Sequence, residues 1–423
     1  MSKPYTTLLG KTVRSIARLR GGGSALPGLF VEKIDPSFVA DTLKQLPHGV
    51  VIISGTNGKT TTTKIVTELL EGQGLKVFTN RTGSNFIRGV AAALLGEVDM
   101  KGKLTADIAV LELDEAHAVH FVRTIPPRYS LLLNVMRDQL DRFGEIDATA
   151  KMLAVIAERT TDGMVLNRED PHIAPLAGSL KGKTVAYFGL SPALAHLFPN
   201  DDELRSGAKA AKELPIADVT LEAFSHETAT FKIDITKYST PLKLQGVYNI
   251  FNAAAALALV RMIMGDKTDT KKLIASLGEV TPAFGRGEKL MIGGQPLELV
   301  LVKNPGGFRL GLSSFPAAEY ATMIAINDNY ADGRDMSWLW DVEFDSLRPT
   351  GVSQVSGIRA YDMALRLQYD EIEISQVEPD LKAALRHFLA QQATKPKRIY
   401  CTYTAMLTLR RELAKITEVE VIG

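Results

Sequence analysis

Short apolar segments alternate with longer amphipathic ones along most of this chain. The apolar runs VVIIS at 50–54, DIAVLEL at 107–113 and YSLLLNV at 129–135 are each followed by a segment whose apolar residues have helical spacing. Strands that are apolar at nearly every position are typical of parallel sheets, whose faces are both covered by the connecting helices. The pattern therefore predicts an α/β fold with a parallel sheet and helices on both faces.

The same pattern divides the chain into three parts. Residues 1–46 contain a basic helical stretch and the flexible sequence GGGSALPG at 21–28, and we expect them to form a separate N-terminal piece. Residues 47–293 form the first α/β unit. After it, a second and smaller α/β unit occupies residues 294–423, because apolar and amphipathic segments alternate again. Its predicted strands are 297–302, 322–327, 351–357, 371–375 and 397–403.

The composition narrows the class of protein. The chain has 423 residues, and its 49 basic and 48 acidic side chains leave a net charge of +1, so we expect no nucleic-acid partner. Neither a signal peptide nor a transmembrane segment is predicted, which indicates a cytoplasmic protein. The one cysteine, Cys401, excludes an internal disulfide and a cysteine-rich zinc site, so no zinc is expected. It lies in the apolar run RIYCTY, which predicts a buried, unreactive thiol.

A glycine-rich turn follows the first apolar run. Residues 54–63 read SGTNGKTTTT, and such a turn between a buried strand and a helix directs successive backbone N–H groups at an anion. Its lysine supplies a charge for the outer phosphates of ATP, and the next threonine supplies a hydroxyl for Mg²⁺. Ile53 stands where the strict phosphate-loop pattern has glycine, and a plain threonine-rich turn is the alternative. The predicted ATP contacts are Gly55, Thr56, Asn57, Gly58, Lys59, Thr60 and Thr61.

Six further motifs follow this loop in order. Together with GTNGKTTTT they resemble the motifs of the Mur ligase family, whose members join an amine to a carboxylate through an acyl phosphate. The resemblance covers nearly all of residues 48–423. It implies a central Mur-type ATPase domain with a parallel sheet, followed by a smaller Rossmann-like α/β domain. The motifs are VLELDE at 110–115, NVMRDQLDRFG at 134–144, VLNRED at 165–170, GVYNIFNAAAA at 246–256, FGRGE at 284–288 and KNPGG at 303–307.

The resemblance implies roles for side chains outside the loop. Glu112, and beside it Glu115, would hold Mg²⁺ near the γ-phosphate, since carboxylates are hard oxygen ligands. Asn249 and Asn252 would bind the adenine edge, to which an amide offers both a donor and an acceptor. Arg286 would contact the phosphates during transfer, which makes it a catalytic candidate together with the loop lysine. A solvated acidic turn and a helix cap are the alternatives for the carboxylates and the amides.

Three positions depart from the family's pattern. Gln139 replaces a histidine that binds a second Mg²⁺ in many members, so the number of ions stays open. Val300 replaces an aspartate and Lys303 a histidine where the second α/β unit begins, so the nucleotide contacts of that loop are expected to differ. About 45 residues precede the ATP loop's strand, too few for a domain that binds a uridine nucleotide.

Residues 327–338, NDNYADGRDMSW, are similar to the Mur ligases that amidate lipid II. This implies that D-glutamate in the stem peptide of lipid II is amidated on its α-carboxylate to give D-isoglutamine. The reaction would take place at the inner face of the membrane. The ammonia would come from a GatD-type glutamine amidotransferase subunit, whose Cys–His pair Asp335 would complete. Asp341 is the next candidate for that role. Trp338 and Trp340 are expected at the partner interface or, alternatively, in the core.

Two other functions stay open at this point. One is a Mur-type ligase that adds an amino acid, as in folylpolyglutamate synthesis. The other is a nucleotide-binding scaffold without ligase activity. The basic stretch at 11–20 fits either a peripheral contact with the membrane or a plain solvated helix face.

Overall fold

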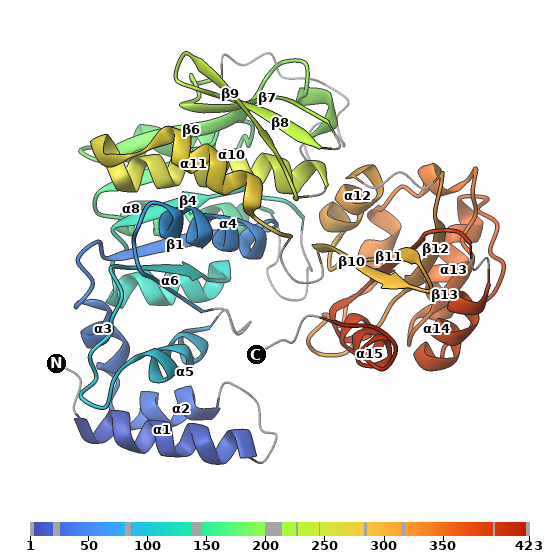
Figure 1. The fold of residues 1–423 in the computed structure, drawn as a ribbon, viewed down its shortest axis with the longest axis horizontal. Helices are drawn as coiled ribbons and strands as arrows, with labels where there is room; N and C mark the ends of the chain where they lie inside the picture. The colour runs from blue at the N-terminus through green and yellow to red at the C-terminus, as the bar shows by residue number, and fades with distance from the viewer. Residues whose placement is uncertain are drawn as a thin grey trace.

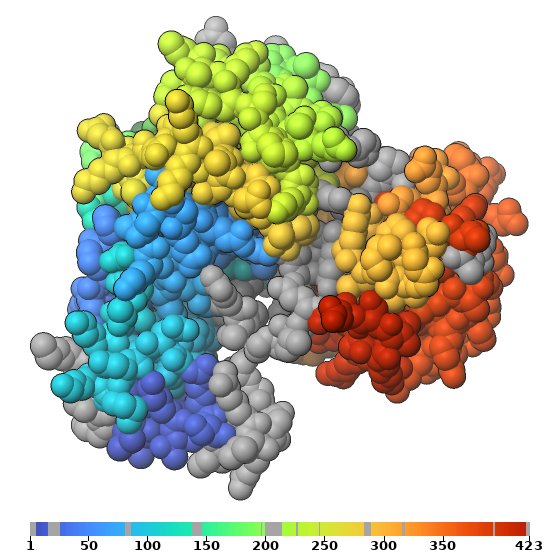
Figure 2. Space-filling view, in the orientation of Figure 1, coloured from blue at the N-terminus to red at the C-terminus, as the bar shows by residue number. Residues whose placement is uncertain are grey.

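A computed structural model describes residues 4–19, 26–80, 86–137, 146–198, 214–225, 227–244, 246–282, 286–314, 318–391 and 394–419. Within these residues the chain forms two α/β units that lie side by side (Figures 1 and 2). The first is built on a nine-stranded sheet with the order β2-β3-β1-β4-β5-β6-β7-β8-β9. Its strands are β1 Val50–Ser54, β2 Val77–Thr79, β3 Ile108–Glu112, β4 Tyr129–Leu132, β5 Gly163–Asn167, β6 Thr184–Leu190, β7 Val219–Phe224, β8 Thr228–Ile233 and β9 Thr236–Pro241.

The strands up to β7 pair in parallel, and β8 and β9 extend the sheet in the antiparallel sense. Successive side chains of β1 point to opposite faces, so Val51 and Ile53 belong to one core and Val50 and Ile52 to the other. The first core is covered by α4 Lys59–Gly72, α10 Val247–Met264 and α11 Thr270–Glu279. The second is covered by α5 Ile87–Glu97, α6 Glu115–Thr124 and α8 Ile146–Arg159.

The N-terminal segment is not the separate piece that the sequence predicted. It forms α1 Pro4–Leu19, α2 Leu26–Ile34 and α3 Phe38–Leu43, and these helices pack beside α5 (Figure 1). Val31, Phe38 and Leu43 are almost fully buried in the same core as the inner face of α5. A Cβ at Gly28 would lie 1.9 Å from the carbonyl oxygen of Arg88, so α2 and α5 approach each other more closely than any other residue would allow.

The second unit contains a five-stranded sheet with the order β10-β11-β14-β12-β13, in which β10 is antiparallel to β11 and the other pairs are parallel. One face packs on α12 Pro305–Ser314 and α13 Ala360–Tyr369, and the other on α14 Leu381–Ala390 and α15 Tyr403–Leu413. The strands are β10 Arg286–Ile292, β11 Gln295–Leu301, β12 Ala321–Ala325, β13 Gln354–Ser356 and β14 Lys397–Cys401. Short 3₁₀ helices are Ala174–Ser179, Ala195–Leu197, Gly265–Lys267, Ser337–Asp341 and Asp345–Leu347.

Two details differ from the sequence expectations. β10 forms a hairpin with β11, so the second sheet already begins at Arg286 and the predicted division at 293/294 falls inside its first turn. The predicted strand at 371–375 is reduced to an isolated bridge between Val352 and Ile374.

One stretch of the described chain, Val247–Lys267, is long and apolar enough to span a membrane. Two-thirds of its most apolar window (67%) is buried inside the protein, as expected for the core helix α10.

Candidate functional site

The phosphate-loop candidate is the turn that joins β1 to α4, and two of its glycines have backbone conformations that other residues rarely adopt. Gly55 has φ +131° and Gly58, which caps α4, has φ +90°. A Cβ at Gly58 would also lie 2.7 Å from the side-chain nitrogen of Asn252. Both the dihedral angle and the close approach therefore require glycine, and they bring the main chain of the loop directly against α10.

Lys59 is buried and folds back over the loop. Its Nζ donates to the carbonyl oxygen of Gly55 at 2.6 Å and lies 3.4 Å from both the carbonyl oxygen of Thr56 and Glu115 Oε1. The two charged side chains are only 5% and 2% exposed. A buried charge is costly without a partner, so Glu115 serves as the counter-ion of Lys59 in this structure.

Thr60 and Glu112 are brought together at the same edge of the sheet. The hydroxyl of Thr60 donates to Glu112 Oε1 at 2.8 Å. A hydroxyl and a carboxylate oxygen form a hard donor pair that fits Mg²⁺, which keeps waters and phosphate oxygens as its other ligands. No group of three or more His, Cys, Asp or Glu side chains within the described residues would hold a metal ion by itself. The pair therefore fits an ion that arrives with a nucleotide.

Three side chains to which the sequence analysis gave no role support the site; Asn134 and Asp170 belong to quoted motifs, and Asn80 does not. Asn80, at the end of β2, accepts from the main-chain N–H of Glu112 at 3.0 Å and donates to its carbonyl at 2.8 Å. Asn134 does the same for Asn57, at 2.9 Å and 3.0 Å. Asp170 accepts from the N–H of Val135 at 2.6 Å, which fixes the segment that carries Asn134. These side chains hold main chain in place, and the weak signal for them is a polar residue directly after an apolar strand.

Asp170 is almost fully buried, and burial raises the pKa of its carboxyl to about 6. The N–H groups of Val135, His172 and Ile173 lower the pKa again by hydrogen bonding to the charged form, but less than burial raises it.

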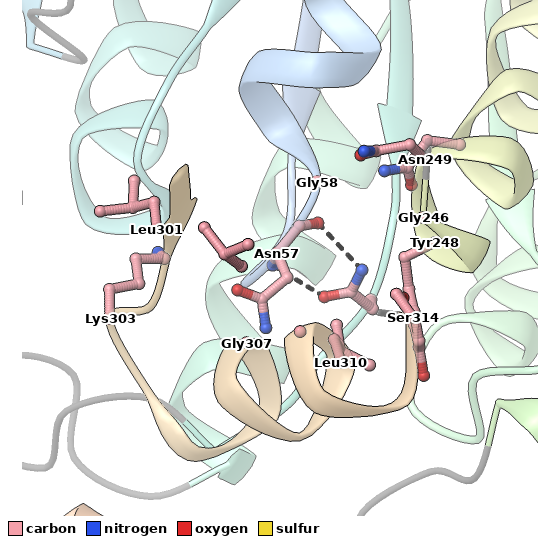
Figure 3. Close-up of a pocket in the computed structure, with 14 residues that line it drawn as sticks. Asn57, Gly58, Gly246, Tyr248, Asn249, Leu301, Lys303, Gly307, Leu310 and Ser314 are labelled. Carbon is pink, nitrogen blue, oxygen red and sulfur yellow. Dashed lines mark hydrogen bonds between the residues drawn. The ribbon is translucent and has the colours of Figure 1, made fainter. Parts of the chain in front are cut away.

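A pocket lies where the loop, the start of α10 and the second unit meet (Figure 3). The first unit contributes the loop residues and the amides near the start of α10, and the second contributes one side of α12 and the residues before it. Of the predicted ATP contacts, Asn57, Gly58, Asn249 and Asn252 line it. The other lining residues are Asn134, Gly246, Tyr248, Val300, Leu301, Lys303, Gly307, Leu310, Gly311 and Ser314.

Other residues predicted from the sequence do not line this pocket. Thr61 is buried, and its hydroxyl has no hydrogen-bond partner. Asp335 is half-buried and accepts from the N–H of Ser337 at 2.9 Å. Arg286 begins β10, but its side chain lies outside what the structure describes, as do all of residues 138–145, which include Gln139.

The segment after Asp335 contains both predicted interface tryptophans. Trp338 is 3% exposed and packs in the core, which is the alternative given for it above, whereas Trp340 is 50% exposed. Asp341 forms an ion pair with Arg137 of the first unit, at 3.0 Å.

The comparisons with known proteins agree on one family. Residues 53–260 match the family described as "Mur ligase middle domain", and residues 301–406 match "MurT ligase C-terminal". The chain is 30% identical to the lipid II isoglutaminyl synthase (glutamine-hydrolyzing) subunit MurT of Streptococcus pneumoniae, over 96% of each chain. The chain belongs to the Mur ligase family. It is therefore a Mur-type ligase, as the motifs predicted.

Solved structures, Mur ligases among them, share the fold. The MurF ligase from Thermotoga maritima, solved in complex with ADP, has a TM-score of 0.65 and 18% identity, over 90% of this chain and 84% of that one. E. coli FolC, solved in complex with DHPP and ADP, has a TM-score of 0.62 and 16% identity, over 90% and 91%. These matches confirm the predicted fold class, a parallel-sheet Mur ligase domain followed by a smaller α/β domain.

Proposed function

We propose that this Mur-type ligase uses ATP to amidate the α-carboxylate of D-glutamate in the stem peptide of lipid II, with ammonia delivered by a GatD-type glutamine amidotransferase. The observation that carries the proposal is the end-to-end similarity to a MurT subunit of lipid II isoglutaminyl synthase, over 96% of both chains. Residues 301–406 of the second unit also match the MurT ligase C-terminal family, which supports the same proposal. The reaction would take place in the cytoplasm, at the inner face of the membrane.

In the proposed reaction a carboxylate oxygen attacks the γ-phosphorus of ATP, and ADP leaves. The acyl phosphate that results carries a good leaving group on its carbonyl carbon. Ammonia then attacks that carbon, loses a proton and displaces inorganic phosphate, which leaves the primary amide. The phosphate loop would bind the triphosphate through its main-chain N–H groups and Lys59, with Asn249 and Asn252 at the adenine and Arg286 at the transferring phosphate.

Thr60 and Glu112 are the residues that would hold Mg²⁺, which neutralises phosphate charge when it is bound. Their 2.8 Å hydrogen bond already places both oxygens at the start of α4. Glu115 Oε1 lies 3.4 Å from the Nζ of Lys59, and we assign this carboxylate to orienting the lysine.

The chemistry of Cys401 supports a separate glutaminase subunit. A glutaminase of this kind requires a reactive thiolate beside a base. Cys401 is fully buried, and burial together with the nearby charge of Asp332 raises the pKa of its thiol far above the ordinary value. The nucleophile that releases ammonia therefore has to come from a partner chain. We assign Asp335 rather than Asp341 to the partner's Cys–His pair, because Asp341 is engaged with Arg137.

The test is an amidation assay with purified protein, lipid II, ATP and ammonium chloride, with the product identified by mass spectrometry. We expect D-isoglutamine in the product, and loss of at least about a hundredfold of the rate in Lys59→Ala, because one phosphate contact in the transition state is removed. The same variant should still form the complex with the partner subunit. Amidation by Lys59→Ala at the wild-type rate would contradict the proposed use of ATP.

A parallel reaction with a folate and glutamate in place of lipid II and ammonium tests the amino-acid-adding alternative. We expect no product there. Wild-type protein that binds nucleotide yet forms no product with either substrate pair would instead favour the scaffold.

A further inference from the structure

The loop after β12 contains several polar residues that precede Asp335 in the motif NDNYADGRDMSW. β12 pairs in parallel with β14, and α15 follows β14 almost directly. Because the carboxyl ends of neighbouring parallel strands lie at the same edge of a sheet, this loop reaches the first turn of α15. The contacts between the two segments are polar and specific.

Thr404, in the first turn of α15, binds three side chains of this loop through one hydroxyl. The hydroxyl accepts from the Nδ2 atoms of Asn327 and Asn329, each at 2.9 Å, and donates to Asp332 Oδ2 at 2.5 Å. A hydroxyl offers one hydrogen and two lone pairs, so these three bonds use its full capacity. The hydroxyl therefore ties both ends of residues 327–332 to a single point on α15.

Asp332 caps α15 from outside the helix. It is 2% exposed, and its Oδ1 accepts from the main-chain N–H of Thr404 at 2.7 Å. Its Oδ2 also accepts from the N–H of Asn329 at 3.1 Å. Thr402, at the N-cap position, makes no capping hydrogen bond with its own side chain. Since N–H groups and the helix dipole stabilise a carboxylate at a helix N-terminus, Asp332 and α15 hold each other in place.

Asp335 lies close behind this anchor. Gly333 is buried and has φ +88°, a conformation that other residues rarely adopt, so the chain turns sharply directly after Asp332. Asp335 is half-buried, and the N–H of Ser337 donates to its Oδ1 at 2.9 Å. The chain then enters the core at Trp338. The carboxylate of Asp335 thus lies between two fixed points, Asp332 before it and Trp338 after it.

We propose that Asp332 and Thr404 are positioning residues for the glutaminase of the partner subunit, because they hold the loop that presents Asp335 to the partner's histidine. The inference rests on the proposed function, since it assumes that Asp335 completes the partner's Cys–His pair. A carboxylate that orients an imidazole acts through a directional hydrogen bond, so the groups that fix the carboxylate affect the rate. Asp332 and Thr404 act through Asp335 and contact neither glutamine nor the thiolate.

The test measures glutamine hydrolysis by the full-length protein in complex with its amidotransferase subunit, with ATP and lipid II present. Thr404→Val keeps the side-chain volume but leaves two amides and one carboxylate oxygen without this partner. We expect its kcat to fall by about tenfold or more, with the KM for glutamine changed by less than about twofold, because the partner binds glutamine. Thr404→Ser keeps the hydroxyl and should restore the wild-type kcat. Asp332→Asn, which removes the charge at nearly constant size, should behave like Thr404→Val.

Thr408→Val is the matched control. Thr408 lies on the next turn of α15, and its hydroxyl donates within the helix to the carbonyl oxygen of Thr404 at 3.1 Å. This variant should keep the wild-type kcat. Ammonium-dependent amidation depends on the ligase alone and should stay at the wild-type rate in Thr404→Val. Circular dichroism, thermal unfolding and titration with the partner establish that every variant is folded and that the complex is saturated.

The inference is overturned if Thr404→Val and Asp332→Asn hydrolyse glutamine with the kcat of Thr408→Val. It is also overturned if Thr404→Val loses glutamine hydrolysis and ammonium-dependent amidation in equal proportion, since that result indicates a general loss of structure. Asp335→Asn distinguishes these results from failure of the proposed function. A wild-type kcat in Asp335→Asn would contradict the role proposed for Asp335, whereas a loss in Asp335→Asn alone would keep that role and reject only the part of Asp332 and Thr404.

Discussion

Several side chains in this site form hydrogen bonds with the main chain of neighbouring loops. Asn80 and Asn134 each bind both the N–H and the carbonyl group of one residue, and Asp170 accepts from the N–H next to Asn134. Each of these side chains lies in a loop directly after a parallel strand. Because buried main-chain groups need partners, such amides and carboxylates hold the loops in one conformation before any ligand arrives.

Gly58 provides a prediction at this scale. We expect Gly58→Ala to reduce ATP affinity by at least about tenfold, because the new Cβ meets the Asn252 amide and the positive φ is unfavourable for alanine. Gly74 has φ +99° with nothing within 4 Å of its Cβ position, so it is the matched control. Gly74→Ala should cost about 1 kcal/mol in the free energy of unfolding and leave ATP affinity unchanged. Equal ATP affinities for the two variants would refute the role of the close approach.

Asp170 provides a second prediction, on pH dependence. Its pKa is raised from 3.8 to about 6 in the folded protein, so folding favours the protonated carboxyl. The stabilising contribution is complete below the unfolded pKa and is lost as the pH rises through about 6. Asp170→Asn cannot titrate, so the free energy of unfolding of wild type should fall relative to this variant by roughly 2–3 kcal/mol between about pH 4 and pH 7.

Urea unfolding followed by far-ultraviolet circular dichroism measures this difference. If the free energies of unfolding of Asp170→Asn and wild type differ by the same amount over the whole pH range, the raised pKa of Asp170 is contradicted. His172 lies close enough to lower the pKa of Asp170, so His172→Gln should move the midpoint upward.

The sequence predicts the loop itself but not what supports it. GTNGKTT follows an apolar strand and precedes a helix, and that context predicts a phosphate loop. Asn134 and Asn304 belong to quoted motifs, but the motifs do not reveal their partner, because Asn57 lies 77 and 247 residues away from them. Asn80 belongs to none of these motifs, and an isolated asparagine has many ordinary roles in loops. The roles of Asn80 and Asn134 follow from the strand order of the parallel sheet, which brings the ends of β1 to β4 together and which a single sequence does not specify.

The solvent-facing side of helix α13 carries large apolar and aromatic side chains. Its inner side packs Met363 and Leu367 in the core, while Tyr361, Leu365 and Tyr369 are 69%, 56% and 76% exposed. Their spacing of four residues puts them on one side of the helix. Trp340 adds to this face, since its ring lies edge-on to that of Tyr369 with the centroids 5.5 Å apart. An exposed aromatic face of this kind is typical of a protein interface.

We expect this face to bind the amidotransferase subunit. Leu365→Asp should weaken the complex by at least about tenfold, because a charge would be buried against the partner, while ammonium-dependent amidation stays at the wild-type rate. Ile235→Asp is the control, as Ile235 is 92% exposed between β8 and β9 of the first unit. Size-exclusion chromatography and titration of the partner measure the effect. Unchanged affinity in Leu365→Asp would place the interface elsewhere.

Most strands and helices were predictable from the hydrophobic pattern, and the exceptions have physical reasons. The segment 371–375 alternates glutamate and isoleucine like a half-buried strand, yet only an isolated bridge at Ile374 forms. The sequence places residues 286–292 in the first unit, because the second alternating pattern begins after the turn GGQP at 293–296. In the structure β10 belongs to the second sheet because it pairs with β11. Such pairing depends on tertiary structure and is not visible in the local pattern.

At the scale of the whole molecule, the described contacts between the two units include a small set of polar ones. The ion pair of Arg137 with Asp341, the facing amides of Asn57 and Asn304, and Lys303 on Thr56 all involve the phosphate loop or the segment after β4. Interfaces between domains of this polar kind permit relative motion unless a ligand bridges them. Family motifs identify both units from the sequence, but their mutual position depends on these contacts and was not predictable.

A nucleotide that contacts both units should hold them together. We therefore expect the radius of gyration, measured by small-angle X-ray scattering, to decrease when ATP and Mg²⁺ are added to wild type. Lys59→Ala should show no decrease at the ATP concentration that gives the full decrease in wild type. An identical radius for wild type with and without ATP would contradict this coupling of nucleotide to domain position.

The most direct measurement of the central claim follows the oxygen atoms of the substrate. Lipid II labelled with oxygen-18 in the α-carboxylate of D-glutamate is incubated with the protein, ATP, Mg²⁺ and ammonium chloride, and the inorganic phosphate is analysed by mass spectrometry. If the carboxylate is activated as an acyl phosphate, one labelled oxygen appears in the phosphate for each amide formed, and Lys59→Ala yields neither product. Amide formation with unlabelled phosphate would contradict the account.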